Sequence, residues 1–380
     1  MDAAFRAMRA AEFPWADDVT YLNNASIGPL PERTRRLLDG FNARRAAPHL
    51  LEDADNVLGL PAARAAAAQL IGADAGEIGL TSNTTYGLNV AAGGLPIRSG
   101  ETVLISEREF PANVYPWLRL RRRGVNVEMI PVTPQGWPDE ARLLERLRDP
   151  AVRILAISLV QFSNGYRADL KALGDACRAN GTWLVVDAIQ ALGHVPFDVR
   201  TTPVDVLACG AQKWLLGPWG AGFVYVRRDL IKTIEPAVVG WMAFEGTDDF
   251  TRLTEYGGPL HADARRVEVA TIPYQDIWGM VESLGLLFEL GIERIADHTR
   301  RLRQPLLAAQ QKGALRIVSP TGGGHDCSIV CVTVKDVAAG FERLKEAKVV
   351  CALREGAIRL SPHCYNTVEE MEKVVEVLAD

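Results

Sequence analysis

From about Glu77 to Tyr225 the chain alternates short apolar, β-rich runs with amphipathic stretches of helical periodicity. This alternation is typical of a mostly parallel sheet with helices on both faces, because parallel strands are buried on both sides. The runs are Ile78–Leu80, Thr102–Ser106, Asn126–Ile130, Ile154–Ser158, Trp183–Asp187, Val206–Cys209 and Gly222–Val226. The sequence therefore predicts an α/β fold with a mostly parallel seven-stranded sheet.

Helices are predicted between and after these runs. The segments are Thr84–Ala92, Asn113–Arg123, Pro138–Leu147, Asp169–Asn180, Tyr274–Leu290 and a charged helix from Ile292. Beyond Gly313, strand runs bracket a helix, and Thr367 with Glu370 forms a capping box for a last helix. These elements are Leu315–Val318, Ser328–Val334, Val337–Ala347 (the helix), Val349–Leu353 and Ala357–Leu360. We expect a large domain over residues 21–290, a smaller α+β C-terminal domain over 291–380, and an N-terminal segment, 1–20, packed on the small domain.

Composition excludes several partners. A net charge of −5 over 380 residues argues against nucleic acid or an anionic membrane as the main partner. The six cysteines form no Cys-x-x-Cys pair, so we expect no metal site and a reducing compartment. Charges interrupt Met1–Phe13, and no run reaches the roughly 18 apolar residues of a membrane span. The sequence predicts a cytoplasmic protein.

Two apolar runs lead into ionisable side chains. Asp187 ends the run Trp183–Asp187, and Lys213 follows the run that begins at Val206. Ligands of open α/β sheets bind beyond the carboxyl ends of the strands. An amine and a carboxylate there can hold pyridoxal phosphate, with the lysine as Schiff base and the acid on the pyridine nitrogen. Taken singly, Asp187 is also explained as a helix cap or ion-pair partner, and Lys213 as a surface lysine.

The segment Thr81–Gly87 follows one strand and precedes a helix. Its hydroxyls and the free N–H groups of the helix N-terminus suit an anion such as a phosphate. Taken alone, the segment is better explained as an ordinary N-cap. Its combination with Asp187 and Lys213 favours a phosphate site.

The ordered motifs resemble those of the class V aminotransferases, a family of fold-type I pyridoxal-phosphate enzymes that includes cysteine desulfurases, isopenicillin N epimerase-like proteins and kynureninase. The resemblance runs from Tyr21–Ala25 to Ser361–Thr367. It implies pyridoxal phosphate as cofactor, Lys213 as the Schiff-base lysine and Asp187 as the partner of the ring nitrogen. The other cofactor contacts that it implies are Thr84 and Thr85 at the phosphate, Asn164 and Gln190 near the ring hydroxyl, and Gln212.

The same resemblance implies an amino-acid substrate and a second subunit. Arg359 matches the arginine that grips the substrate α-carboxylate, a task suited to its bidentate fork. Asn24 lies on a predicted substrate loop. Thr271 falls where the family lends a phosphate contact from the neighbouring subunit, which implies a homodimer with shared active sites.

The chain departs from the desulfurases at two positions. Phe110 stands where desulfurases have a histidine on the cofactor ring, and a phenyl ring stacks but carries no proton. The segment from Val349 to Arg359 is too short for the mobile loop that carries the desulfurase cysteine. Cys351 is therefore interpreted as an apolar strand residue, and persulfide chemistry is not predicted.

The reaction type stays open among chemistries that begin with removal of the Cα proton. The resemblance favours aminotransferase-type chemistry, followed by a lyase (C–S cleavage or β-elimination) and then an epimerase. An epimerase needs a second acid or base, and Asn24, Ser26, His49 and Tyr256 are each better explained as structural or pocket-lining residues. A catalytically silent cofactor-binding scaffold would be expected to lose Lys213, Asp187 or Arg359, and all three are present.

Overall fold

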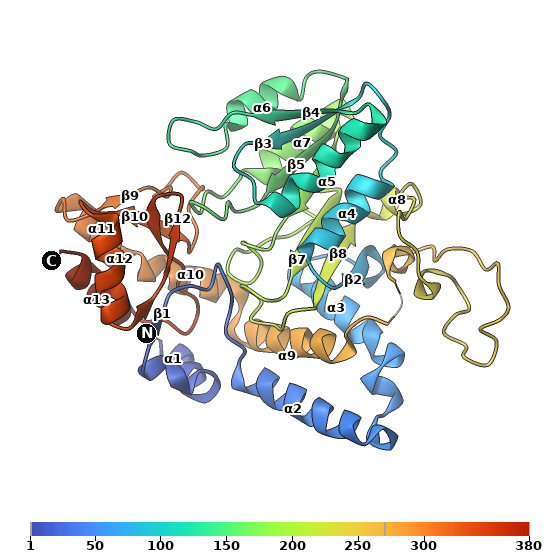
Figure 1. Ribbon diagram of the computed structural model, residues 1–380, viewed down its shortest axis with the longest axis horizontal. Helices are drawn as coiled ribbons and strands as arrows, with labels where there is room; N and C mark the ends of the chain where they lie inside the picture. Colours follow the sequence, from blue (N-terminus) through green and yellow to red (C-terminus); the bar gives the residue numbers. More distant parts are fainter. Residues whose placement is uncertain (1, 270, 380) are drawn as a thin grey trace.

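The computed structural model describes residues 2–269 and 271–379. In this part of the chain a seven-stranded sheet has the order β2-β8-β7-β6-β5-β3-β4 (Figure 1). The strands are β2 (Ile78–Thr81), β3 (Thr102–Ser106), β4 (Asn126–Ile130), β5 (Val152–Ser158), β6 (Trp183–Asp187), β7 (Val206–Gly210) and β8 (Gly222–Val226). All neighbours pair in parallel except β8, which is antiparallel to β2 and β7. The predicted α/β fold and its mostly parallel sheet are confirmed.

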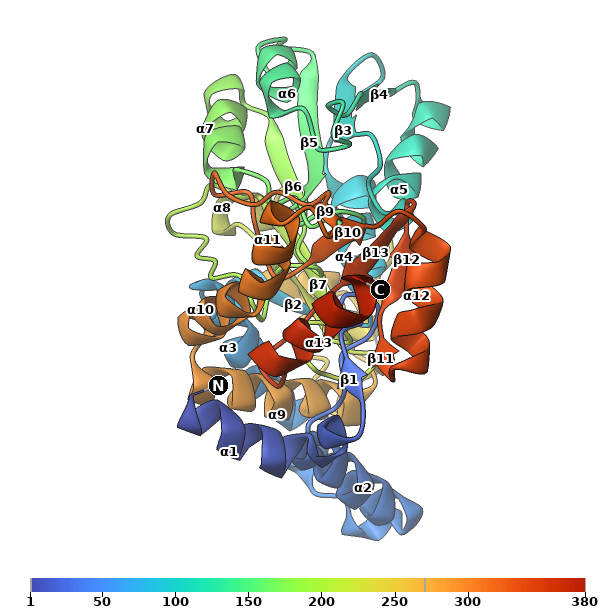
Figure 2. The same cartoon turned by 90° about the vertical axis from the view of Figure 1, so that its left-hand side faces the viewer.

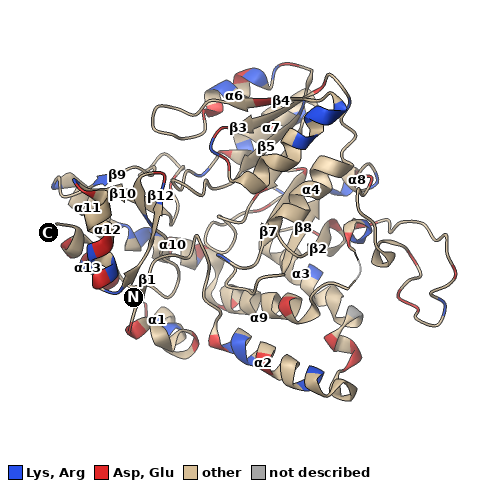
Figure 3. Cartoon of the chain, viewed as in Figure 1, with Lys and Arg blue, Asp and Glu red and all other residues tan. Residues whose placement is uncertain are grey.

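The strands are apolar because helices cover both faces of the sheet. Successive strand residues point to opposite faces, and Leu184 and Val186 of β6 pack in one core cluster while Val185 packs in another. Strands β7 and β8 are buried along their whole lengths. Figure 3 shows them without charged residues, whereas blue and red residues are interspersed on the outer helices. The charged groups that lie near these strands therefore call for a specific explanation.

Helix α4 (Thr84–Gly94) packs directly on the sheet. A Cβ at Gly87 would meet the Cβ of Ala208 in β7 at 2.7 Å, so only glycine allows this approach. The backbone N–H of Gly210, at the end of β7, donates to Thr84 Oγ1 at 2.9 Å. The N-terminus of α4 is thereby fixed beside the carboxyl end of β7.

The remaining helices lie either around the seven-stranded sheet or in the C-terminal part of the chain, to one side of that sheet (Figures 1 and 2). They are α1 (Ala3–Glu12), α2 (Glu32–Ala46), α3 (Leu60–Ile71), α5 (Tyr115–Leu118), α6 (Glu140–Arg146), α7 (Leu170–Asn180), α8 (Arg228–Ile231), α9 (Tyr274–Leu290), α10 (Ile292–Leu302), α11 (Gln304–Gln311), α12 (Val337–Glu346) and α13 (Val368–Ala379). The continuous helix predicted over Asn113–Arg123 is wrong: a short α5 lies between two 3-10 turns. Pro116 has no N–H to donate and therefore lies in the first turn of α5.

A second sheet lies in the C-terminal part of the described chain, in the order β12-β13-β10-β9. Its strands are β9 (Arg316–Ile317), β10 (Val330–Thr333), β12 (Ala352–Arg354) and β13 (Ala357–Leu360). The single strand predicted over Val349–Leu353 is wrong. It is split at Cys351, because β11 (Val349–Val350) pairs in parallel with the N-terminal strand β1 (Thr20–Tyr21) instead.

The N-terminal helix contacts the C-terminal part of the chain. Arg9 of α1 forms an ion pair with Glu370 at 3.0 Å and donates to the carbonyl oxygen of Tyr365. Phe5 stacks on His298, with ring centroids 4.6 Å apart. The domain boundaries proposed from the sequence stay predictions. Of the described helices, none combines the length and the apolar character needed to cross a bilayer.

Candidate active site

A cavity of about 290 Å³ opens at the carboxyl ends of β6 and β7. Its lining joins segments that are far apart in the sequence. The lining residues are Ala25, Ser26, Asn83, Thr84, Thr85, Phe110, Ala112, Phe162, Asp187, Ile189, Gln190, Gln212, Lys213, Arg354 and Arg359. Eight of the residues selected from the sequence lie here: Thr84, Thr85, Phe110, Asp187, Gln190, Gln212, Lys213 and Arg359.

Asp187, the last residue of β6, is buried at the base of the cavity. The backbone N–H of Ile189 donates to its Oδ1 at 3.0 Å. The pKa of this carboxyl is raised to about 7, mainly by burial and in part by the Glu109 carboxyl, against the opposing effects of the Ile189 N–H and the Lys213 ammonium. A cationic partner in the cavity would favour the ionised form of Asp187.

Lys213 is presented by a tight turn that follows β7. The N–H of Leu216 donates to the carbonyl oxygen of Lys213 at 3.1 Å, and Leu216 closes the turn with a left-handed φ of +56°. The Lys213 Nζ lies 5.5 Å from the ring centroid of Phe110. Burial lowers the pKa of Lys213 to about 8. An amine in these surroundings is partly unprotonated near neutral pH, as a nucleophile or base must be.

Neighbouring residues hold this turn in place. Trp214 is fully buried, and its Nε1 donates to Gln190 Oε1 at 2.9 Å. A Cβ at Gly28 would meet the carbonyl oxygen of Lys213 at 2.0 Å, so the N-terminal loop lies directly against the lysine turn. This close approach brings Ala25 and Ser26 of the same loop to the cavity wall.

Arg359 of β13 is 1% exposed. Its Nη1 donates to the carbonyl oxygen of Phe162 and its Nη2 to Ser26 Oγ, each at 2.7 Å. Its buried Nε has no hydrogen-bond partner, and no carboxylate of the described residues forms an ion pair with this guanidinium. Burial lowers its pKa to about 10. A buried, unpaired cation is costly, and the planar guanidinium suits a carboxylate ligand.

The N-terminus of α4 forms another part of the wall. Asn83 caps the helix by accepting from the N–H of Tyr86 at 2.9 Å. Thr84 and Thr85 occupy the first two helical positions. The first N–H groups of a helix lack intrahelical partners and carry a partial positive charge. This end of the cavity therefore favours an anion.

Three residues selected from the sequence do not line this cavity. Asn24 is buried, and its Oδ1 accepts from the hydroxyl of Tyr365 at 3.0 Å. Asn164 donates to the carbonyl oxygen of Gly136 at 2.8 Å, so its amide faces another loop. Thr271 is exposed on its own chain, with a φ of +50°.

Other lining or supporting residues were not selected from the sequence. Arg354 and Phe162 lie on the cavity wall, and Glu109 lies behind it. Glu109 is buried and accepts from Ser158 N at 2.8 Å and from Asn113 Nδ2 at 3.2 Å, which fixes the turn that carries Phe110. Burial raises the pKa of Glu109. The sequence pairs Glu109 with Phe110 but gives no sign of these partners.

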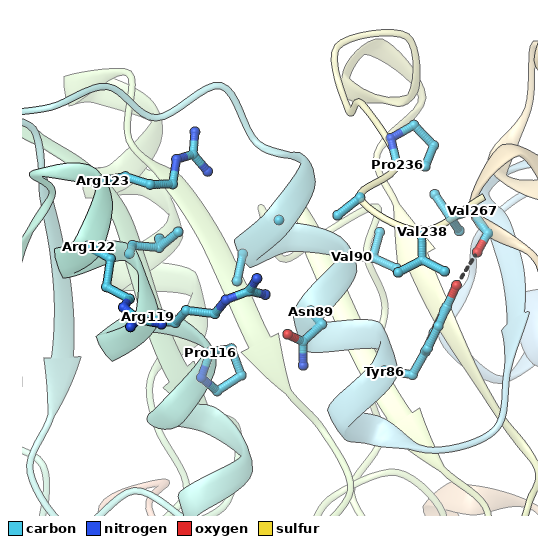
Figure 4. Close-up of a pocket in the computed structure, with 14 residues that line it drawn as sticks. Tyr86, Asn89, Val90, Pro116, Arg119, Arg122, Arg123, Pro236, Val238 and Val267 are labelled. Carbon is cyan, nitrogen blue, oxygen red and sulfur yellow. Dashed lines mark hydrogen bonds between the residues drawn. The ribbon is translucent and has the colours of Figure 1, made fainter.

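A larger cavity of about 470 Å³ lies between α4, α5 and the segment after α8 (Figure 4). Arg119, Arg122 and Arg123 are on one side of it, and Tyr86, which donates to the carbonyl oxygen of Val267 at 3.0 Å, is on the other. The described residues that line it include no lysine and no carboxylate. The smaller cavity is therefore the better candidate for an active site.

The two shifted pKa values predict how the stability of the ligand-free protein changes with pH. Between pH 3.8 and about 7 the native state keeps a proton on Asp187 that the unfolded chain has released. The free energy of unfolding therefore falls as the pH rises through this range. Between about pH 8 and 10.5 the native state has lost the Lys213 proton, whereas the unfolded chain still holds it. The free energy of unfolding therefore rises with pH in this range. Each slope is at most about 1.4 kcal/mol per pH unit. Urea unfolding at a series of pH values gives the free energy of unfolding of wild type, Asp187→Asn and Lys213→Met. The difference between wild type and each variant measures the contribution of that residue. If the free energies of wild type and variant stayed parallel across these pH ranges, the predicted contribution would be contradicted.

Comparison with known protein families and with individual relatives leads to the same family. The family model of aminotransferase class V matches residues 41–374. The uncharacterized aminotransferase YcbU of Bacillus subtilis is 30% identical over 312 residues, covering 82% of this chain and 81% of the relative. A probable cysteine desulfurase of Methanothermobacter thermautotrophicus is 29% identical, and the match covers 97% of this chain and 96% of the relative. The isopenicillin N epimerase of Streptomyces clavuligerus is 28% identical, with 95% and 94% covered.

Solved structures share the fold. The apo cysteine desulfurase of Thermococcus onnurineus has a TM-score of 0.85 at 22% identity, covering 98% of this chain and 97% of the other. A variant of C-DES with glycine covalently linked to its PLP cofactor has a TM-score of 0.88 at 23% identity, with 98% and 99% covered. Because the family model matches most of the sequence, this chain belongs to the aminotransferase class V family of enzymes.

Proposed function

We propose that this chain is a pyridoxal-phosphate-dependent enzyme that acts on an amino acid, with aminotransferase-type chemistry. One observation carries the proposal: the half-buried Lys213 and the buried Asp187 share a cavity with Arg359, a buried guanidinium that no carboxylate of the described residues pairs. This combination suits a cofactor with an electrophilic carbon and a basic ring nitrogen, and a substrate with a carboxylate.

The residues present fit the cofactor. The N-terminus of α4, with Thr84 and Thr85, suits its phosphate. Asp187 suits the ring nitrogen, because a protonated pyridine would supply the cation that this carboxyl lacks. Gln190 keeps one amide hydrogen free after donating to the carbonyl oxygen of Ala25 at 2.9 Å, and this hydrogen suits the ring hydroxyl. When bound, pyridoxal phosphate supplies an electron sink for a carbanion at the substrate Cα.

In this proposal the chain itself moves one proton and orients one carboxylate. Lys213 Nζ would accept the Cα proton and return it, and burial, which lowers the pKa of the free amine to about 8 in the ligand-free chain, favours its unprotonated form. Arg359 binds the α-carboxylate, which holds the substrate in one orientation toward the lysine. Phe110 and Phe162, whose rings meet edge to face at a centroid distance of 5.2 Å, limit the access of water.

An amino-acid panel tests the reaction type. The purified enzyme is incubated with each amino acid and assayed for keto acid, ammonia, sulfide and the inverted enantiomer. We expect keto acid with an amine transferred to an added keto acid. Release of ammonia that does not depend on an added keto acid would support the lyase instead. The described residues of the cavity wall offer only Lys213 and Asp187 as proton carriers near neutral pH, which argues against two-base epimerisation.

Cys351→Ala is expected to leave turnover within about twofold of wild type, since only a thiolate is nucleophilic. Cys351 is 8% exposed in a hydrophobic cluster, and burial raises its pKa to about 12. The connection between β12 and β13 is a two-residue turn, Glu355–Gly356, with φ values of +47° and +80°. No mobile loop is available there to carry a cysteine to the cavity. Cysteine-dependent sulfide release that Cys351→Ala abolishes, but Cys177→Ala does not, would contradict this expectation.

We also propose a cytoplasmic homodimer in which Thr271 contacts the phosphate in the partner subunit. Thr271 is exposed and does not line the cavity of its own chain, so a cofactor contact requires a second copy. Light scattering after size-exclusion chromatography measures the mass. Mixing Lys213→Ala with Thr271→Ala subunits then tests the sharing. Thr271 and Lys213 would serve the same site from different subunits, so a mixed dimer would combine both defects in one site and leave the other site intact.

A further inference from the structure

We propose that Arg354 binds an anionic group on the substrate side chain, so that the enzyme selects amino acids with acidic side chains. This inference rests on the proposed function, because it assumes that Arg359 holds the α-carboxylate. Arg354 lies on the cavity wall beside Arg359, and no role follows for it from the cofactor chemistry.

The position of Arg354 is built into the hairpin of β12 and β13. Arg354 is the last residue of β12 and pairs with Ala357 across the two-residue turn. Both turn residues have left-handed φ values, which defines a tight hairpin with little freedom of register. The Arg354 Nη1 also donates to the carbonyl oxygen of Leu353 at 2.7 Å. These contacts direct an exposed side chain toward the mouth of the cavity.

One hydroxyl brings the two guanidinium groups together. Ser26 Oγ accepts from Arg359 Nη2 at 2.7 Å and from Arg354 Nη2 at 3.4 Å. In the described part of the chain, neither arginine forms an ion pair with a carboxylate. After burial, the charge of Arg354 is the next cause that lowers the pKa of Arg359. Two adjacent cations therefore face one cavity with only a neutral hydroxyl between them.

A single α-carboxylate neutralises only one of these charges. A second anionic group on the same ligand would neutralise the other, and each guanidinium can bind a carboxylate with two parallel hydrogen bonds. In an amino acid with an acidic side chain the two carboxylates are only a few bonds apart. This short separation matches two guanidinium groups that donate to the same hydroxyl oxygen. The alternative is that both arginines bind the α-carboxylate.

Binding of acids matched in chain length separates these two arrangements. Succinate is compared with butyrate, and glutarate with valerate, by isothermal titration calorimetry on the holoenzyme. The variants are Arg354→Gln, Arg359→Gln and Arg316→Gln, the last an exposed arginine of β9 that does not line the cavity. Because none of these acids has an amino group, the measurement reports binding without turnover.

We expect wild type and Arg316→Gln to bind each dicarboxylate at least about tenfold more tightly than its monocarboxylate, a difference of about 1.4 kcal/mol. Arg354→Gln should erase that preference and leave butyrate affinity within about twofold. Arg359→Gln should weaken all four acids. If Arg354→Gln weakened the binding of dicarboxylates and monocarboxylates equally, or if wild type did not prefer dicarboxylates, the inference would be overturned and the proposed function would stay intact. Full binding in Arg359→Gln would overturn the assignment of Arg359, and this inference with it.

Discussion

Lys213→Ala is expected to lower kcat/KM by at least about 10³-fold, because the substitution removes both the attachment point of the cofactor and the proton carrier. The visible absorption of the lysine-bound cofactor should disappear as well. The structural reason is the position of Lys213: a tight turn holds it over the end of β7, and Phe110 lies 5.5 Å from its Nζ. The measurements are an absorption spectrum after incubation with pyridoxal phosphate, and steady-state kinetics.

Two controls separate this loss from misfolding. Lys232→Ala removes an exposed lysine beyond α8 and should leave both the spectrum and turnover unchanged. Added methylamine should restore part of the turnover of Lys213→Ala, because a free amine can enter the space that the side chain leaves. A visible band of full intensity in Lys213→Ala, or turnover within tenfold of wild type, would show that another residue carries the chemistry.

Asp187→Asn is expected to lower kcat by about 10²- to 10⁴-fold, the range of a well-placed acid–base or electrostatic group. The amide keeps the size of the side chain but removes the negative charge that would hold a proton on the ring nitrogen. Since Lys213 is unchanged, the visible band should persist, and any shift in its wavelength would come from the lost charge. Activity should fall while cofactor binding is retained.

The Asp187→Glu variant completes this test. It keeps the charge but moves the carboxylate by one methylene, so we expect a loss smaller than that of Asp187→Asn. Circular dichroism and urea unfolding show whether each variant is folded. Full activity in Asp187→Asn would contradict the assigned role, and loss of the visible band would assign the residue to cofactor retention instead.

The strands of the main sheet could be predicted because burial on both faces leaves a continuous apolar run for each of them. The polar ends of those runs were equally visible, which is why Asp187 and Lys213 could be selected. The helix over Asn113–Arg123 was mispredicted because its helical residues surround Pro116, and the position of that proline decides where a short helix begins.

Side-chain direction could not be predicted in the same way. Asn24 Oδ1 accepts from Tyr365 and Asn164 Nδ2 donates to Gly136, contacts that the sequence does not reveal, and the site roles expected for both residues stay predictions. Arg354 was missed for the converse reason. Its place on the cavity wall depends on the pairing of β12 with β13, and a sequence does not show the register of two short strands.

The central claim is that Lys213 binds pyridoxal phosphate covalently. Borohydride reduction of the holoenzyme, followed by proteolysis and mass spectrometry of the peptides, tests it directly, because reduction makes the bond between cofactor and lysine permanent. We predict one modified peptide per chain, with the cofactor on Lys213. Modification of a different lysine, or no incorporation after incubation with an excess of cofactor, would contradict the claim.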